Sequence, residues 1–112
     1  MMDSSAVLGF IPVDVRSQAR QVGRDFAWPV AVAPDVINAV AASGRMVLGL
    51  ELWTFSSGMR TPKVIGSSDY GAREAGSRLD AIRRSSEAAR LDLLRVVSDP
   101  TLWVQIEWDE PR

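Results

Sequence analysis

The chain of 112 residues contains neither cysteine nor histidine. Without cysteine there is no disulfide, no thiolate nucleophile and no thiolate metal site. Without histidine there is no Ser-His-Asp or Cys-His catalytic group, and most zinc sites lose their usual ligand. These two absences exclude the commonest enzyme mechanisms. Carboxylate chemistry and oxygen-ligated Mg²⁺ or Ca²⁺ remain open.

Neither sign of charge dominates, because 13 basic and 14 acidic residues give a net charge of −1. This balance gives no reason to expect a nucleic acid or an anionic membrane as a partner. Lys63 is the only lysine, so arginine supplies almost all the positive charge. Two interpretations stay open: the arginines contact a carboxylate-rich or phosphate-bearing partner, or they simply cover solvated helix faces.

Long apolar runs are also missing. No apolar stretch approaches the roughly 20 residues that cross a bilayer, and Asp3, Gly9 and Pro12 interrupt the segment that a signal peptide would need. The length fits one domain with one hydrophobic core. We therefore expect a single cytoplasmic domain over residues 1–112.

Two short helices are predicted in the first half of the chain. The spacing of Val15, Ala19 and Val22 predicts a helix over 15–22, after Asp14 as N-cap and before a glycine. A second helix begins at Pro34, whose missing N–H is unbonded in a first turn anyway, and it ends at a glycine, Gly44.

A longer helix is predicted over about 73–97, with Ser68 or Asp69 capping it. One stripe of its residues repeats every three or four positions and is expected to face the core: Ala75, Leu79, Ile82, Ser86, Ala89, Leu93 and Val97. Leu91 lies outside this stripe. It is either a lone exposed apolar residue, which is normal, or part of a contact with a second chain.

Three strands are predicted. Residues 46–55 are apolar on both faces, which indicates a central strand covered on both sides. A return strand over about 59–65 contains Pro62 and therefore belongs at an edge. Residues 101–109 alternate between apolar and polar. The predicted fold is α+β, with element order ααββαβ and a small, mostly antiparallel three-stranded sheet packed against two or three helices, the last strand beside the central one.

Glu51 is the oddest residue, because a carboxylate in a ten-residue apolar strand needs a partner or a function. Either it pairs with an arginine on a partly open face, or it projects toward a site. Alternation predicts that it shares a face with other acids and with tryptophans, if the last strand is its neighbour. This candidate partner-binding set consists of Glu51, Trp53, Trp103, Glu107 and Asp109.

Such a surface suits the docking of a basic partner, because aromatic side chains anchor and rim charges steer. As a catalytic site it lacks a nucleophile and a tuned base, although paired carboxylates leave a hydrolase as a third hypothesis. We therefore expect no enzyme activity, no cofactor and no metal. Another cluster of Asp25, Phe26, Trp28 and Pro29 is interpreted as a hydrophobic staple for the second helix in preference to a ligand cage.

The middle of the chain resembles a bacterial immunity-protein family of polymorphic toxin systems, number forty in their usual catalogue. The resemblance covers about residues 20–90 and rests on two segments, 23–28 (GRDFAW) and 47–53 (VLGLELW). Glu51 falls on the family's acidic position and Trp53 near its aromatic one. Ala27-Trp28 reverses the family's Trp-Ala dipeptide, Leu50 replaces a glycine, and a later proline and aromatic loop, here Pro62 and Tyr70, fit loosely.

This resemblance implies a protein that binds and neutralises a cognate toxin domain in the cytoplasm, with no catalysis and no obligatory cofactor. The alternative is a small structural or regulatory interaction domain, homodimeric through exposed aliphatic and tryptophan surface. Neither hypothesis involves a nucleic acid or a membrane.

Overall fold

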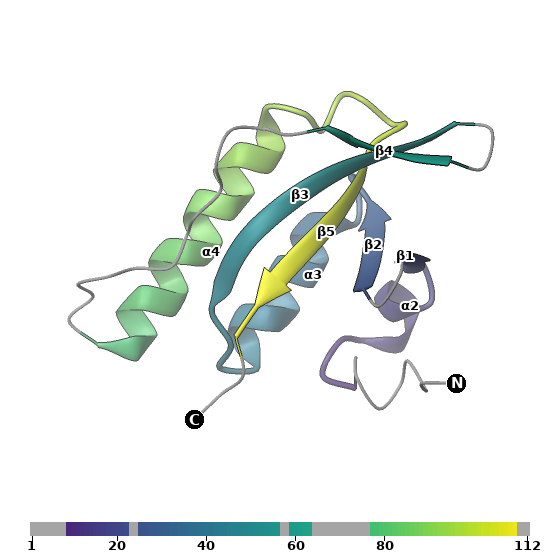
Figure 1. The fold of residues 1–112 in the computed structure, drawn as a ribbon. Helices are drawn as coiled ribbons and strands as arrows, with labels where there is room; N and C mark the ends of the chain where they lie inside the picture. Colours follow the sequence, from purple (N-terminus) through teal and green to yellow (C-terminus); the bar gives the residue numbers. More distant parts are fainter. Residues whose placement is uncertain (1–8, 23–24, 57–58, 64–76, 110–112) are drawn as a thin grey trace.

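The computed structural model describes residues 9–22, 25–56, 59–63 and 77–109, which form an α+β fold as the sequence predicts (Figure 1). Within these ranges, three helices and five strands follow one another in this order: α2 (Val13–Arg16), β1 (Arg20–Val22), β2 (Asp25–Pro29), α3 (Ala33–Ala42), β3 (Val47–Ser56), β4 (Met59–Lys63), α4 (Arg78–Leu94) and β5 (Trp103–Trp108).

The strands form one antiparallel sheet with the order β1-β2-β5-β3-β4. The predicted part, in which the central strand lies between an edge strand and the C-terminal strand, is confirmed. The predicted total of three strands is wrong, because β1 and β2 extend the sheet beyond β5. Both are short, with three and five residues, so neither shows the alternation of apolar and polar residues from which a strand is predicted.

The first predicted helix, over 15–22, is the main error. The helix found is one turn, Val13–Arg16, with Pro12 at its N-cap and Asp14 inside the first turn. The chain then turns, and Arg20–Val22 pairs with the neighbouring strand β2. Three apolar residues at helical spacing were too few to specify a helix, because such spacing is also met by a turn followed by a strand.

The second helix is confirmed. Pro34 lies in the first turn of α3, and Val36, Ile37 and Val40 are fully buried. Gly44 follows the helix with φ of 84°, the left-handed conformation in which a residue without Cβ pays no steric penalty.

The third helix is shorter than predicted. It begins at Arg78, and the hydroxyl of Ser77 caps it by accepting a hydrogen bond from the N–H of Asp80 at 3.1 Å. The predicted caps Ser68 and Asp69 lie outside the described residues, as does Ala75. Four members of the predicted stripe are buried, namely Ile82, Ser86, Ala89 and Leu93, whereas Leu79 and Val97 are 79% and 43% exposed.

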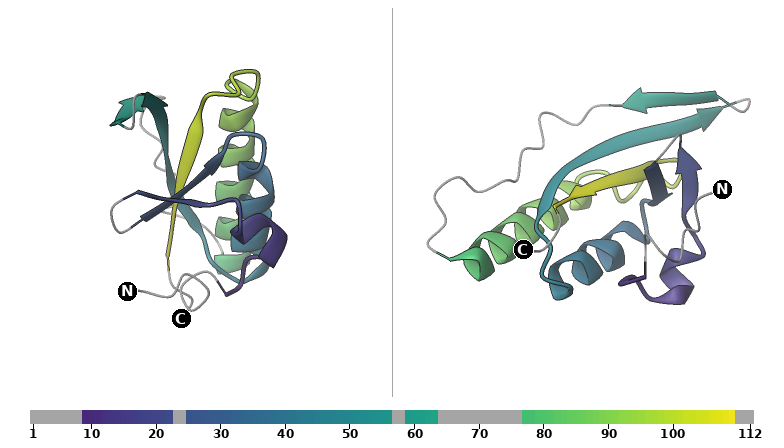
Figure 2. Two further views of the ribbon diagram at one scale, coloured as in Figure 1. Left: turned by 90° about the vertical axis from the view of Figure 1, so that its right-hand side faces the viewer. Right: turned by 60° about the horizontal axis from the view of Figure 1, so that its bottom comes forward.

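Helices α3 and α4 lie side by side against one face of the sheet (Figure 2). No element in the described part of the chain covers the other face. The prediction that the central strand is covered on both sides is thus confirmed for the face that carries the helices, and for the other face it stays a prediction. The core lies between the sheet and the helices, and its fully buried side chains include Trp28, Ile37, Leu52, Leu93 and Val104.

A bulge at the start of β3 changes which of its side chains enter the core. Val47 is opposite Trp108, but the next pair joins Gly49 to Glu107, so two residues of β3 oppose one of β5. Alternation from residue 46 predicts that Val47 faces away from Leu50 and Leu52. The bulge reverses this phase, and Val47 is fully buried beside them.

The aromatic cluster before α3 is part of the sheet. Trp28 lies in β2, is fully buried and packs at 6.4 Å, between ring centroids, from Trp108. Its indole N–H donates to the carbonyl oxygen of Val15 at 3.2 Å. Trp28 therefore has a structural role in this cluster: it connects α2 to the sheet, whereas the sequence predicted a staple for the second helix.

Candidate functional site

The surface of the sheet that faces away from α3 and α4, called here the open face, carries most of the predicted binding residues. Strand pairing places Trp53 directly opposite Trp103, Glu51 opposite Gln105, and Gly49 opposite Glu107. The residues between them, such as Val104 and Ile106 on β5, belong to the core, so this set points the other way. The structure therefore brings Glu51, Trp53, Trp103 and Glu107 onto one face.

Two polar contacts fix the tryptophans of this face. The indole N–H of Trp53 donates to Oε1 of Gln105 at 3.0 Å, and Gln105 is only 7% exposed. The guanidinium of Arg20, on β1, lies 5.7 Å from the ring centre of Trp103, within the range of a cation–π attraction. Both indoles are half-buried, so each keeps a partly exposed surface in a defined orientation.

Acidic residues occupy the neighbouring positions of the same face. Glu51 is half-buried and Glu107 is exposed. Asp25, two residues before Ala27 on β2, is exposed and belongs to the same face by alternation. Within the described residues, Glu51 makes no ion pair or hydrogen bond through its carboxylate. The arginine partner that would have given Glu51 a purely structural role is not found in this part of the chain.

Asp109 is separated from this set. It follows the end of β5, and its carboxylate accepts a hydrogen bond from the N–H of Met46 at 2.7 Å. It also receives two hydrogen bonds from Arg78 of α4, each 3.0 Å long, and Arg78 donates a further one to the carbonyl oxygen of Gly44. The hydrogen bond to Asp109 raises the pKa of Arg78, more than partial desolvation lowers it. Asp109 thus joins the end of β5 to the start of β3 and to α4, and these contacts hold the fold together.

Sequence reasoning missed two members of the open face. Gln105 shares the alternating positions of Trp103 and Glu107, so its place was readable from β5, but a neutral amide gave no reason to single it out. Arg20 was assigned to a helix that does not form there. Only the pairing of Arg20 with Ala27, which requires the missed strand β1, places it on the same face as Trp103.

The chemistry of the open face is that of recognition. The described residues include no group of three or more acidic side chains close enough to hold a metal ion. None of the helices described combines the length and apolar character needed to cross a membrane. What the face offers is two oriented indoles, a buried amide, an arginine and three carboxylates, which suit hydrogen bonding, stacking and charge attraction.

Comparison with known proteins finds no match to this chain. No family model matches the chain, and neither a curated protein nor a solved structure does. The residues and the geometry of the open face are therefore what bears on function.

Proposed function

We propose that this chain is an immunity protein that binds and neutralises a cognate toxin domain through the open face of its sheet. The observation that carries the proposal is the register of β3 and β5, which sets Trp53 beside Trp103. These indoles adjoin Glu51 and Glu107 on a face that no described element covers.

This arrangement supports binding on physical grounds. Aromatic side chains with a fixed orientation lose little conformational entropy when a partner packs on them, and they often supply most of an interface's binding energy. The carboxylates of Glu51 and Glu107 add attraction for a basic surface, which raises the rate of association and excludes acidic partners. Glu51 also costs the fold some desolvation without a described internal partner, and a basic group of the toxin would offset that cost.

Neutralisation by binding needs no catalytic group in the inhibitor, and this matches a chain without cysteine or histidine. A toxin domain that acts on nucleic acid or on nucleotides has a basic active site, because it must bind phosphates. The open face would cover such a site by presenting carboxylates to it. Inhibition then consists of occupying the site and excluding the substrate.

The test is co-expression with the toxin domain encoded by the neighbouring gene. The wild-type protein should restore growth, and Trp53→Ala and Glu51→Arg should each abolish or greatly weaken the rescue. Arg83→Ala is the matched control, since Arg83 is an exposed residue of α4 on the opposite side of the sheet and should rescue fully.

Binding of the purified protein to a catalytically inactive form of the toxin, measured by calorimetry, separates docking from expression effects. Failure of the folded wild-type protein both to rescue and to bind would overturn the proposal. Rescue that is unaffected by changes at Trp53 and Glu51 would retain the function but exclude the open face.

A further inference from the structure

The carboxylate of Glu51 and the indole of Trp53 are neighbours on the open face. The two residues are two positions apart on β3, so their side chains leave the same face about 7 Å apart along the strand. The indole N–H of Trp53 donates to Oε1 of Gln105, and Gln105 is directly opposite Glu51 in the pairing of β3 with β5. This hydrogen bond therefore turns the indole toward the row of the sheet that Glu51 occupies.

Glu51 is a half-buried carboxylate to which the described part of the chain gives neither an ion pair nor a hydrogen bond. Burial removes part of its hydration, and a carboxylate that loses water needs a cation or hydrogen-bond donors in exchange. Asp109 shows how this protein meets that need elsewhere, because Arg78 donates to both oxygens of its carboxylate. At Glu51 the corresponding guanidinium is left for a partner to supply.

The open face already holds one guanidinium against an indole. Arg20 of β1 lies 5.7 Å from the ring centre of Trp103, and Trp103 is directly opposite Trp53. A guanidinium is planar and weakly hydrated, so it can lie flat on an aromatic ring while its N–H groups point outward from the edge of the group. On the half-buried ring of Trp53, such outward N–H groups meet the carboxylate of Glu51.

We propose that this part of the open face binds one arginine side chain of the partner. The guanidinium stacks on the exposed part of Trp53, and two of its N–H groups donate to the two carboxylate oxygens of Glu51. Lysine fits less well, because its compact, strongly hydrated ammonium neither stacks on a ring nor donates to both oxygens in a planar fork.

The identity of the partner as a toxin domain rests on the proposed function, whereas the arginine subsite is a property of Trp53 and Glu51 themselves. The subsite also sharpens how neutralisation would work. An arginine that binds the phosphate of a substrate presents the same fork of donors, so holding that arginine at Glu51 removes it from the substrate.

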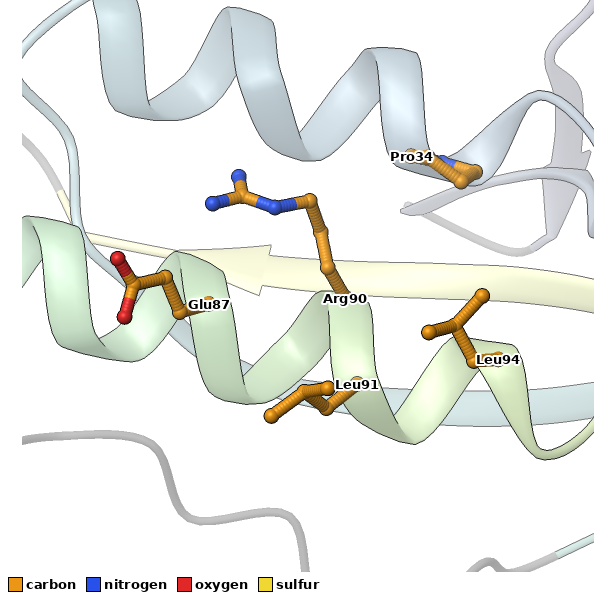
Figure 3. A pocket seen from close by; sticks show the side chains of 5 residues that line it. All are labelled: Pro34, Glu87, Arg90, Leu91 and Leu94. Carbon is orange, nitrogen blue, oxygen red and sulfur yellow. The ribbon is translucent and has the colours of Figure 1, made fainter.

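The helical side of the molecule provides a contrasting carboxylate. Figure 3 shows Glu87 and Leu91 on α4, where they line a groove between α3 and α4. An oxygen of Glu87 lies 3.5 Å from Nη1 of Arg83 on the same helix, and none of the described residues that line this groove is aromatic. Glu87 thus has the charge of Glu51 without the indole beside it, which makes it the matched control.

Nuclear magnetic resonance of the ¹⁵N-labelled protein tests the subsite without the toxin. The probes are N-acetyl-arginine methylamide and N-acetyl-lysine methylamide, each titrated to tens of millimolar at constant ionic strength. The arginine probe should shift the indole N–H signal of Trp53 until it saturates, and the lysine probe should bind about fivefold more weakly. The indole signal of Trp28, whose ring is fully buried, is the internal reference and should not move.

Variants assign the two halves of the subsite. Glu51→Gln should weaken binding of the arginine probe about tenfold, because an amide has neither the charge nor the second acceptor oxygen. Trp53→Leu should weaken it as well, and Trp53→Phe should weaken it less, because phenylalanine keeps an aromatic surface. Glu87→Gln should bind the probe like the wild type. Circular dichroism of each variant confirms that it is folded.

An arginine probe that leaves the Trp53 signal unmoved overturns the subsite. So does a probe that binds Glu51→Gln as tightly as the wild type, or a lysine probe that binds as tightly as the arginine probe. In these cases the proposed function still stands if the wild-type protein binds and neutralises the toxin. If instead the arginine probe binds as expected and the protein neither binds the toxin nor restores growth, the subsite is retained and the proposed function fails.

Discussion

The indole N–H of Trp28 donates a hydrogen bond to the carbonyl oxygen of Val15, 3.2 Å away, with both residues buried. This bond joins the one-turn helix α2 to the second strand of the sheet. The same carbonyl also accepts a hydrogen bond from the N–H of Gln18 at 3.1 Å, so the indole is its second donor, and the indole N–H itself is the group that needs this partner in the core.

Trp28→Phe should therefore lower the free energy of unfolding by about 1–3 kcal/mol, from the lost hydrogen bond together with the smaller ring. Urea unfolding followed by circular dichroism measures the loss. Trp53→Phe is the matched control. It also removes an indole hydrogen bond, but the Trp53 ring is half-buried and lies outside the core, so the smaller ring leaves no core cavity and the loss should be smaller than for Trp28→Phe. Equal losses in the two variants would contradict the structural role of the Trp28 bond.

The link between Arg78 and Asp109 gives a prediction about pH. Arg78→Met should lower the urea midpoint, because it removes the hydrogen bonds to Asp109 and to the carbonyl of Gly44. The pKa of Arg78 is raised by Asp109. A raised pKa gives stability that is fully present below the unfolded-state pKa and is lost only as pH rises through the folded-state value.

Both pKa values of Arg78 are far above neutral. The difference between the wild type and Arg78→Met should therefore stay constant from neutral to mildly alkaline pH. Arg84→Met, at an exposed arginine on the same helix, controls for the loss of a positive charge and should change the midpoint less. A difference that disappears across this pH range would show that another titrating group, and not Arg78, controls the stability of this link.

The end of α3 provides a prediction about backbone conformation alone. Gly44 has a φ of 84°, and a Cβ built on it meets no atom within 4 Å. Gly44→Ala should then cost about 1 kcal/mol purely from the left-handed conformation. Gly44→Asn should cost less, because asparagine adopts this conformation more readily than alanine. If both variants are as stable as the wild type, the helix must end in a different conformation.

The sequence predicted best the elements whose signals are local and redundant. The second helix combined a proline in its first turn, an apolar face and a terminal glycine, and all three are found in α3. The last strand alternated over its whole length, and that alternation placed Trp103 and Glu107 together. The edge position of β4 followed from Pro62, because proline cannot donate to a strand ladder.

The errors arose where a residue's place depends on distant partners. β1 is defined by its pairing with β2, and β2 also pairs with β5. No sequence pattern within residues 15–29 predicts those contacts. The bulge between Val47 and Gly49 shifts the phase of β3 through its pairing with β5. Asp109 continued the alternation of Trp103 and Glu107 in the sequence, but it lies just after the end of β5. There its carboxylate accepts hydrogen bonds from Arg78 and from the N–H of Met46.

The final prediction separates binding from stability on the open face. Glu51 has no partner among the described residues, so Glu51→Gln should change the free energy of unfolding by less than about 0.5 kcal/mol. If Glu51 attracts a basic surface of the toxin, the same change should weaken the complex about tenfold, which corresponds to about 1.4 kcal/mol. The affinity of the variant should also depend less on salt, because one screened attraction is missing.

Asp109→Asn is the matched control, with the opposite expected pattern. It weakens the contacts with Met46 and Arg78, so it should lower the urea midpoint while the folded protein keeps its affinity for the toxin. Calorimetric binding and urea unfolding of the two variants, measured side by side, decide between the roles. A Glu51→Gln protein that is destabilised as much as Asp109→Asn, with unchanged affinity, would show that Glu51 supports the fold and does not contact the partner.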